Sequence, residues 1–286
     1  MEGDVFERIR ARRTGMSPGY RRVADYLARH HRDAAFLPAA DVAEAAGVSE
    51  SLVVRFAASL GYDGYPGLTR ELREIVKASL SLPQRLRGRP ADLGASTPAA
   101  DVWRAVAAQD EANLRATVED PTSSPLEDVL DAMLRARRIY VLGLRGPAHL
   151  AGLFGVLLDK AGADVRVITS GDVVMFDALR HIGPHDLLFA FTFARYTRRT
   201  LEALRLARMQ GAATVVVTDA LAAPAVAETD HSLHVRVDSA SFQHSYTAVI
   251  GLMNALVVAW TLRAPERTLG SLEALEAVLP HDDFLS

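Results

Sequence analysis

Two short segments place cationic and hydroxyl-bearing side chains directly after apolar, strand-like runs. Their candidate ligand-binding residues are Arg145, Gly146, Thr192, Arg195, Tyr196 and Thr197. A guanidinium group binds carboxylate or phosphate through two parallel hydrogen bonds, and hydroxyl groups supply further donors. The chemistry that these residue types support is therefore the binding of a small anion.

The elements that would position these segments follow Arg137, where apolar runs alternate with helical patterns. Strands are expected at 139–144, 165–169, 187–193, 214–218 and 233–237, with helices at 150–161 and 200–210 between them. Strands that are apolar on both faces and alternate with helices indicate a doubly wound parallel α/β sheet. Ligands of such sheets bind beyond the carboxyl ends of the strands, where the strand order reverses. Both segments are expected there.

The first 80 residues are almost wholly helical in pattern. Val42, Ala43 and Ala46 form an apolar stripe, Gly47 suits the left-handed end of that helix, and Ser49 is expected to cap the next one. A helix, a tight turn and a second helix are the parts of a helix-turn-helix DNA reader, although any two packed helices can show this pattern. The outward positions that would contact DNA are Ser49, Glu50, Ser51, Val54 and Arg55.

Further motifs within residues 17–72 resemble the N-terminal domain of the RpiR family of bacterial transcription regulators. The resembling segments are residues 21–27, 42–49, 53–56, 60–62 and 64–65. This resemblance implies that the front part binds a double-stranded DNA operator. It also implies the overall fold class, an all-helical helix-turn-helix domain followed by a doubly wound α/β domain.

Residues from about 130 to 260 resemble the SIS domain, a phosphosugar-binding module that commonly follows the RpiR-type DNA-binding domain. The resemblance is supported by residues 207–211, by Thr218 and Asp219 with Pro224, and by Thr229 with Asp230. It implies that hydroxyls and helix amides after the third strand receive a phosphate.

The chain departs from the SIS pattern in both ligand loops. The usual third-strand sequence is Ser-x-Ser-Gly-x-Thr, whereas this chain has Ala194 for the second Ser and Arg195 for the Gly. The first loop usually reads Gly-x-Gly-x-Ser, and here Arg145 replaces the second Gly and Pro147 the Ser. The two arginines could bind an anion between neighbouring strands, with Tyr196 closing over it; alternatively, the pocket has degenerated and both arginines form structural pairs.

A third candidate segment, residues 238–246, precedes an apolar helix expected at 248–260. The resemblance implies that this loop reaches a neighbouring subunit's pocket, which makes Ser241, His244 and Ser245 candidate ligand residues. Helix capping by Ser241 and simple packing of His244 are the alternatives.

Composition sets the outer limits. The 286 residues include 23% charged residues and no Cys, and the net charge of −3 means that any DNA-binding surface must come from local clustering. A Pro-, Gly- and Ser-containing stretch suggests three parts, a DNA-binding domain at 1–80, a linker at 81–100 and a ligand-sensing and dimerisation domain at 101–286. No apolar run approaches ~20 residues. We expect a cytoplasmic protein with no membrane partner, and neither a cofactor nor a metal site, because the histidines lack a metal-binding spacing.

Three functions remain open from the sequence. The first is a transcription regulator, a homodimer or a dimer of dimers, that senses a small anion and binds a palindromic operator. In the second, the SIS-like domain only dimerises. The third is a phosphosugar isomerase, which needs a positioned base and acid, and His244 is the only obvious base in the expected loops.

Overall fold

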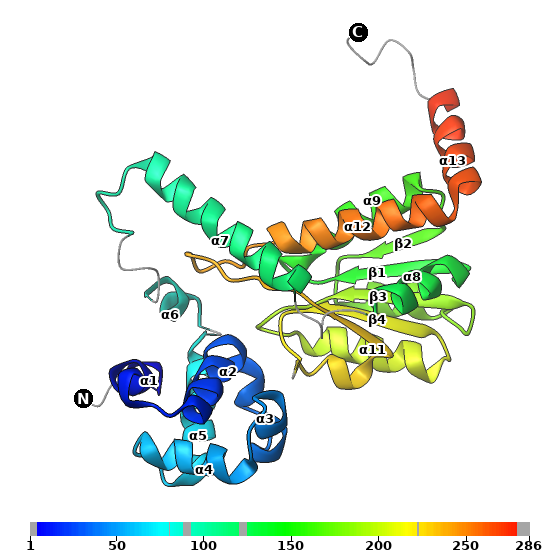
Figure 1. Ribbon diagram of the computed structural model, residues 1–286. Coiled ribbons are helices and arrows are strands. Elements are labelled where there is room, and N and C mark those ends of the chain that lie inside the picture. The colour runs from blue at the N-terminus through cyan, green and yellow to red at the C-terminus, as the bar shows by residue number, and fades with distance from the viewer. Residues whose placement is uncertain (1–4, 80, 88–92, 120–124, 222, 279–286) are drawn as a thin grey trace. The chain divides into compact units, whose positions relative to one another are not determined.

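A computed structural model describes residues 5–79, 81–87, 93–119, 125–221 and 223–278. The chain divides into two compact units, Met1–Ala91 and Asp92–Ser286. This boundary lies inside the linker expected at 81–100. That segment is not wholly irregular, because Leu82–Arg87 forms helix α6 (Figure 1).

The first unit is a helical bundle. Its elements are α1 (Val5–Arg12), the 3-10 turn η1 (Arg13–Gly15), α2 (Pro18–Ala34), α3 (Ala39–Ala45), α4 (Glu50–Ser59) and α5 (Gly64–Ser79). Ser17 caps α2 by accepting a hydrogen bond from the Tyr20 amide, and Pro18 occupies the first helical position, as expected of a helix start. One apolar cluster joins all five helices, and its largest fully buried members are Leu27, Phe56, Leu60, Leu68 and Leu72.

Tyr65 fixes α5 against the end of α2. Its hydroxyl donates to the Leu37 carbonyl at 2.9 Å and lies 3.3 Å from that of Ala34. Burial, with a smaller contribution from Tyr26, raises the pKa of Tyr65 to about 12. The hydroxyl therefore remains protonated, and able to donate, at neutral pH.

The second unit is a parallel sheet of five strands, in the order β2-β1-β3-β4-β5. The strands are β1 (Arg138–Gly143), β2 (Val165–Ile168), β3 (Asp186–Phe191), β4 (Ala213–Thr218) and β5 (His231–His234). The helices are α7 (Ala99–Glu119), α8 (Leu126–Arg135), α9 (Pro147–Lys160), α10 (Val173–Leu179), α11 (Arg198–Met209), α12 (Thr247–Arg263) and α13 (Pro265–Val278), with a 3-10 turn η3 (Val226–Glu228) before β5. The expected doubly wound α/β domain is confirmed.

Two apolar layers sandwich the sheet (Figure 1). Side chains from α8, α9 and α12 cover one face, where Phe154, Phe189 and Trp260 are fully buried. Residues of α10 and α11 cover the other face, around Leu142, Met175 and Leu204. Each central strand is therefore apolar on both sides, which explains why the strands read as nearly unbroken apolar runs.

Element ends differ from the sequence-based expectation in several places. The last strand is β5, His231–His234, which begins two residues and ends three residues earlier than the expected range 233–237. Pro125 occupies the N-cap position of α8. Helix α7 buries Asn113, whereas its apolar residues Val102, Val106 and Leu114 remain more than a third exposed.

No single helix among the described residues is long and apolar enough to cross a membrane. Only α12 and α13 together reach that length and composition, and the pair is bent by 104°.

Two adjacent arginines at the start of β1 provide a test of the folding energetics. Arg137 binds both carboxylate oxygens of the buried Asp186 at 3.0 and 2.9 Å, whereas Arg138 binds the half-exposed Asp164 with similar geometry and lowers the pKa of that carboxyl group. Because Arg137→Ala leaves a buried carboxylate without its cation, we expect it to lower the free energy of unfolding by ~1–2 kcal/mol. The matched variant Arg138→Ala should cost ~0–1 kcal/mol. Both tryptophans, Trp103 and Trp260, lie in the second unit, so urea unfolding followed by tryptophan fluorescence measures the stability of each variant. Equal losses of stability in the two variants would contradict the prediction.

Candidate functional site

The helix-turn-helix geometry is formed by α3, a tight turn and α4. Gly47 follows the last turn of α3 with a φ of 63°, the left-handed conformation that its position was expected to need. The Gly47 and Val48 amides donate to carbonyl groups of α3, at 3.1 Å to Glu44 and 2.9 Å to Ala43. These bonds end α3 and direct the chain into α4.

All five predicted DNA-contact residues lie on the exposed side of α4 and its start, while Val53 and Phe56 face the core. The five are Ser49, Glu50, Ser51, Val54 and Arg55. One local detail was wrong: Ser49 stands at the N-cap position, but its side chain makes no capping bond and lies 3.2 Å from the Ser51 hydroxyl instead. The surface therefore offers two hydroxyls, a carboxylate, a guanidinium and an exposed valine, the groups that bind base edges, phosphates and thymine methyls.

The second candidate site lies at the carboxyl ends of β1 and β3. These strands are neighbours, with Gly143 paired to Phe191, although β2 lies between them in sequence. The chain adds β2 on one side of β1 and then adds β3 to β5 on the other side. The strand order therefore reverses between β1 and β3, which is where doubly wound sheets bind ligands.

Arg145 and Arg195, which stand where the family pattern has glycine, both have a left-handed backbone. Their φ angles are 64° and 70°, and among the described residues they are the only non-glycine residues with positive φ. The left-handed conformation costs a residue with a Cβ atom about 1–2 kcal/mol. Both side chains are exposed, and neither guanidinium forms a hydrogen bond or ion pair with another described residue. The alternative of structural pairs with carboxylates is thus not seen in the described parts of the chain.

Asp219, at the end of β4, fixes the loop between β3 and α11. Its Oδ1 accepts hydrogen bonds from the Ala194 amide at 3.1 Å and from the Tyr196 hydroxyl at 2.8 Å. The residue is only 7% exposed. The Tyr196 hydroxyl is therefore tied to the base of the loop in this structure.

The hydroxyl groups of the same loop have different surroundings. Thr192 is buried at the end of β3, and its amide continues the sheet by donating to the Val217 carbonyl at 3.0 Å. Thr197 caps α11, since its Oγ1 lies 3.4 Å from the Thr200 amide and 2.7 Å from the Thr200 hydroxyl. Beside Thr192, the Thr218 hydroxyl is fully buried and has no hydrogen-bond partner among the described residues.

Gly146 begins the turn into α9 and lies against the end of the Tyr246 side chain. A Cβ atom built at this position would lie 2.8 Å from the Tyr246 hydroxyl. The Tyr246 ring in turn packs on Phe193 with 5.5 Å between the ring centres. The first ligand loop therefore touches residues 238–246, as well as lying next to β3.

The loop 238–246 is held by its own chain. His244 Nε2 lies 3.0 Å from the Ala194 carbonyl oxygen, which can only accept, so Nε2 donates. Ser245 Oγ donates to Asp110 of α7. The prediction that Ser241 caps the next helix was wrong, because α12 begins at Thr247 with Tyr246 at the cap position, and the Ser241 amide donates to the Ser239 hydroxyl. A local serine pattern did not reveal this, because α12 starts five residues later than a Ser241 cap would place it.

Sequence reasoning missed three contributors to this site. Asp219 was noted as support for the SIS resemblance but not as a site residue, and the aromatic pair Phe193 and Tyr246 was not considered. Gly171, in the loop after β2, also reaches the site, because a Cβ atom there would lie 3.0 Å from Leu144 and 3.4 Å from Arg199. In the part of the chain that the structure describes, no group of three or more His, Asp or Glu side chains forms a metal-binding cluster.

The arrangement agrees with comparisons to known proteins. A SIS domain model matches residues 132–259, and the model of the helix-turn-helix domain of the rpiR family matches residues 3–79. The uncharacterized HTH-type transcriptional regulator YfhH of Escherichia coli (strain K12) is 28% identical over 196 residues, which are 67% of each chain.

Solved structures show the same fold. The sugar isomerase domain of an RpiR transcription factor from Sphaerobacter thermophilus aligns with a TM-score of 0.59 and 27% identity, covering 62% of this chain and 99% of that one. The Vibrio vulnificus NanR protein, solved in complex with ManNAc-6P, aligns over 96% of this chain and 97% of its own with a TM-score of 0.55 and 21% identity.

A helix-turn-helix domain joined to a SIS domain defines a transcription regulator. The chain belongs to the RpiR family of such regulators, with its DNA-binding domain at the N-terminal end and its SIS domain after it.

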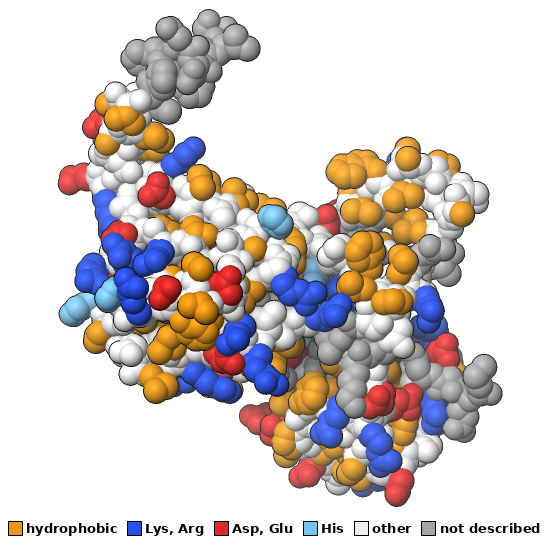
Figure 2. All heavy atoms as spheres, turned by 180° about the vertical axis from the view of Figure 1, so that it is seen from behind, with side chains coloured by type: hydrophobic (Ala, Val, Ile, Leu, Met, Phe, Trp, Pro, Cys, Tyr) orange, Lys and Arg blue, Asp and Glu red, His pale blue; other side chains and the backbone are white. Residues whose placement is uncertain are grey.

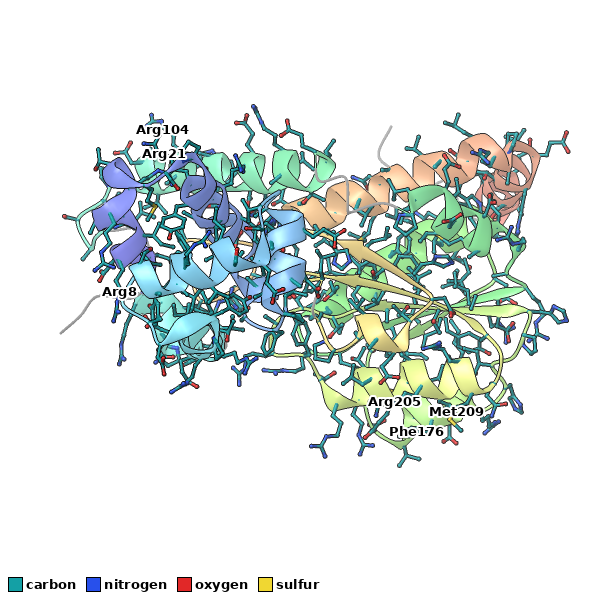
Figure 3. The ribbon with its side chains drawn as sticks, turned by 60° about the horizontal axis from the view of Figure 1, so that its bottom comes forward. Arg8, Arg21, Arg104, Phe176, Arg205 and Met209 are labelled. Atoms are coloured by element: carbon teal, nitrogen blue, oxygen red, sulfur yellow. The ribbon has the colours of Figure 1, made fainter. Side chains whose placement is uncertain are left out.

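The exposed face of α4 yields a prediction about DNA binding. Because Arg55 is the only cation among the five candidate residues, we expect Arg55→Ala to weaken binding to DNA selected from a random library by about 10- to 100-fold, or ~1–3 kcal/mol. Fluorescence anisotropy measures the affinity. Arg205→Ala is the matched control, because it removes the same charge from α11 on the outside of the α/β unit (Figure 3). Equal losses in the two variants would show that α4 does not read DNA.

The left-handed arginines yield a prediction about stability. Arg195→Gly relieves the backbone strain but makes the unfolded chain more flexible, so we expect a net gain of ~0.5–1 kcal/mol in the free energy of unfolding. The control Arg205→Gly, in the middle of α11, should instead lose ~1 kcal/mol. Urea unfolding followed by tryptophan fluorescence tests both, and a loss of stability on Arg195→Gly would contradict the strained conformation.

Proposed function

We propose that the SIS domain senses a small anionic metabolite, a sugar phosphate or a related acid, and that binding changes the affinity of the helix-turn-helix domain for its operator. The observation that carries this proposal is the pair Arg145 and Arg195. Both are strained, exposed and without an ionic partner among the described residues, and both follow strands that are neighbours at the reversal of strand order. Strain of this kind is retained where the site uses it.

The loops supply suitable chemistry for an anion with hydroxyl groups. The two guanidinium groups would bind its charge, and Thr192, Thr197 and the first amides of α11 lie in the loop to which the family pattern assigns phosphate. Gly146 leaves room beside Tyr246, while Tyr196 and His244 hold the loop in place. Ser241 and Ser245 stay in the proposal as residues of the adjoining loop. NanR, whose fold this chain shares, was solved with a sugar phosphate bound.

Dimerisation would link the SIS domain to DNA. Helix α7 carries exposed apolar side chains toward the end that extends away from the sheet (Figures 1 and 2), among them Val102, Trp103 and Val106. Apolar surface of this kind marks an interface, and we assign it to a second copy in a homodimer or a dimer of dimers. Two DNA-binding domains would then meet a palindromic operator with half-sites about one helical turn, ~34 Å, apart. Because the operator is chromosomal DNA, we place the protein in the cytoplasm.

The ligand would act by shifting a population of dimer geometries. If it binds one geometry better than another, the segment 81–100 passes that difference to the spacing of the two recognition helices. An isomerase activity is less favoured, because the Nε2 of His244 is used by the Ala194 carbonyl. We therefore propose a regulator and not an enzyme.

The alternative is a SIS domain that only dimerises. Two observations favour it. Ala194 lacks the hydroxyl of the serine that the SIS pattern has at this position, and the Ala194 amide already donates to Asp219. Operator binding that ignores every metabolite would support it.

The test uses the full chain with DNA selected from a random library. A panel of sugar phosphates, sugar acids and polyols is screened by thermal shift, and each compound that binds is then added to the protein and its DNA. We expect at least one anion to change operator affinity by about 5- to 150-fold, the usual range of coupling between two sites. Arg145→Ala and Arg195→Ala should each abolish this response but keep DNA affinity in the absence of ligand. The matched control is Arg198→Ala, which removes an exposed arginine from the first turn of α11. A response that survives in both variants removes the two arginines from the ligand site.

A further inference from the structure

The environment of Asp219 carries an inference about which anions the SIS domain accepts. This inference rests on the proposed function and specifies its ligand. Asp219 is 7% exposed and stands at the end of β4, while the loop that it binds follows β3. The structure thus places an acidic side chain inside the loop that is expected to hold an anion.

The hydrogen bonds show how closely the carboxylate is built into that loop. Asp219 Oδ1 takes the Ala194 amide at 3.1 Å and the Tyr196 hydroxyl at 2.8 Å, on either side of the left-handed Arg195. Ala194 is also held on its carbonyl side by His244 at 3.0 Å. Three hydrogen bonds thus tie this loop to Asp219 and His244. Any anion that enters must therefore share the loop with this carboxylate.

A carboxylate beside a ligand has a defined chemical preference. An ionised carboxylate has only acceptors, so it binds O–H donors and opposes an oxyanion whose oxygens are all acceptors. The opposition grows with ligand charge and is stronger in a partly buried loop than in water. Sites built to bind a ligand hydroxyl reject the analogue that lacks it more strongly than apolar pockets reject a missing methylene.

We propose that Asp219 is a specificity-determining residue that restricts the SIS domain to oxyanions carrying an O–H donor, and that it rejects fully ionised oxyanions without one. Arg145 and Arg195 supply the attraction for negative charge, and Asp219 selects among the anions so attracted. Ligands of this class include singly ionised phosphate monoesters and hydroxy acids. The buried hydroxyls of Thr192 and Thr218, on the neighbouring ends of β3 and β4, add polar groups beside the selecting carboxylate.

Phosphate and sulfate test this selection because they share a tetrahedral shape. At about pH 6.5 phosphate keeps at least one O–H, whereas sulfate has none. Equilibrium dialysis of the full chain with radiolabelled phosphate and sulfate, without DNA, gives the two affinities. We expect the wild-type chain to bind phosphate at least about 10-fold more tightly than sulfate. Wild-type protein that binds both equally, or binds neither, overturns the proposal.

Two variants are expected to change the phosphate-to-sulfate affinity ratio in opposite directions. Asp219→Asn keeps the shape and an oxygen acceptor for Ala194 and Tyr196 but removes the charge, so the phosphate-to-sulfate ratio should fall to within about threefold of one. Tyr196→Phe removes a donor from Asp219 and leaves the carboxylate more available, so the ratio should rise by a few-fold. If Asp219→Asn does not fold, as judged by circular dichroism, the affinity ratios of the wild-type chain and of Tyr196→Phe still test the proposal.

Asp230→Asn is the matched control. Asp230 also accepts one amide and one hydroxyl, both from Thr214, but at the opposite end of β4. Its replacement should leave the ratio unchanged, and a ratio that changes equally in the Asp219 and Asp230 variants would overturn the proposal. If the phosphate-to-sulfate affinity ratio is as expected but no anion changes operator binding, the sensor function is contradicted and the selection by Asp219 is not. An unchanged ratio in Asp219→Asn would end the selection while leaving the sensor function open.

Discussion

The parallel pairing of β1 with β3 is the constraint on which the candidate ligand site depends. These strands are separated in sequence by α9, β2 and α10, yet their register brings Gly143 opposite Phe191. Each strand therefore ends at the same edge of the sheet, and the loop after each strand contains a left-handed arginine. A strand inserted between them would place the two loops about 5 Å further apart, because neighbouring strands lie ~4.7–4.9 Å from one another. The adjacency is what makes an anion bridge between Arg145 and Arg195 a sensible proposal.

The loop after β3 is held in an unfavourable conformation by contacts from three directions. Asp219 binds it from β4, His244 binds it from the segment before α12, and Thr197 anchors its end on α11. Each of these hydrogen bonds contributes about 0.5–1.5 kcal/mol, more where a carboxylate takes part, which together suffices to offset the left-handed backbone of Arg195. The same bonds explain why a carboxylate lies in an anion loop, since Asp219 is also the residue that shapes it.

Helix α7 connects the site to the surface proposed for dimerisation. Its second half is bound to the segment before α12 by a hydrogen bond from Asn113 to the Asp238 carbonyl at 2.7 Å. It is also bound to the first residue of α12, because the Thr247 hydroxyl donates to Asp110 at 2.8 Å. Its first half exposes Trp103. A second copy that packs on α7 would therefore act on a helix already bonded to the loop that holds His244. This is a physical route, within one domain, between the ligand loop and a dimer contact.

The sequence by itself determined the elements and the class of each domain. The 3.6-residue apolar periods of the helices, the unbroken apolar runs of the strands, Gly47 and the Arg145 and Arg195 replacements are local features, so they are visible before folding. Together with the family resemblance, they predicted the helix-turn-helix unit and the parallel sheet. The sequence did not show that neither Ser49 nor Ser241 makes a capping hydrogen bond to the helix it was expected to cap, because several nearby polar residues compete for each cap position. Only the tertiary structure decided that Asp219 and His244 meet at Ala194, 25 and 50 residues away. Such contacts depend on strand order and on where loops cross the sheet edge, which no local pattern encodes.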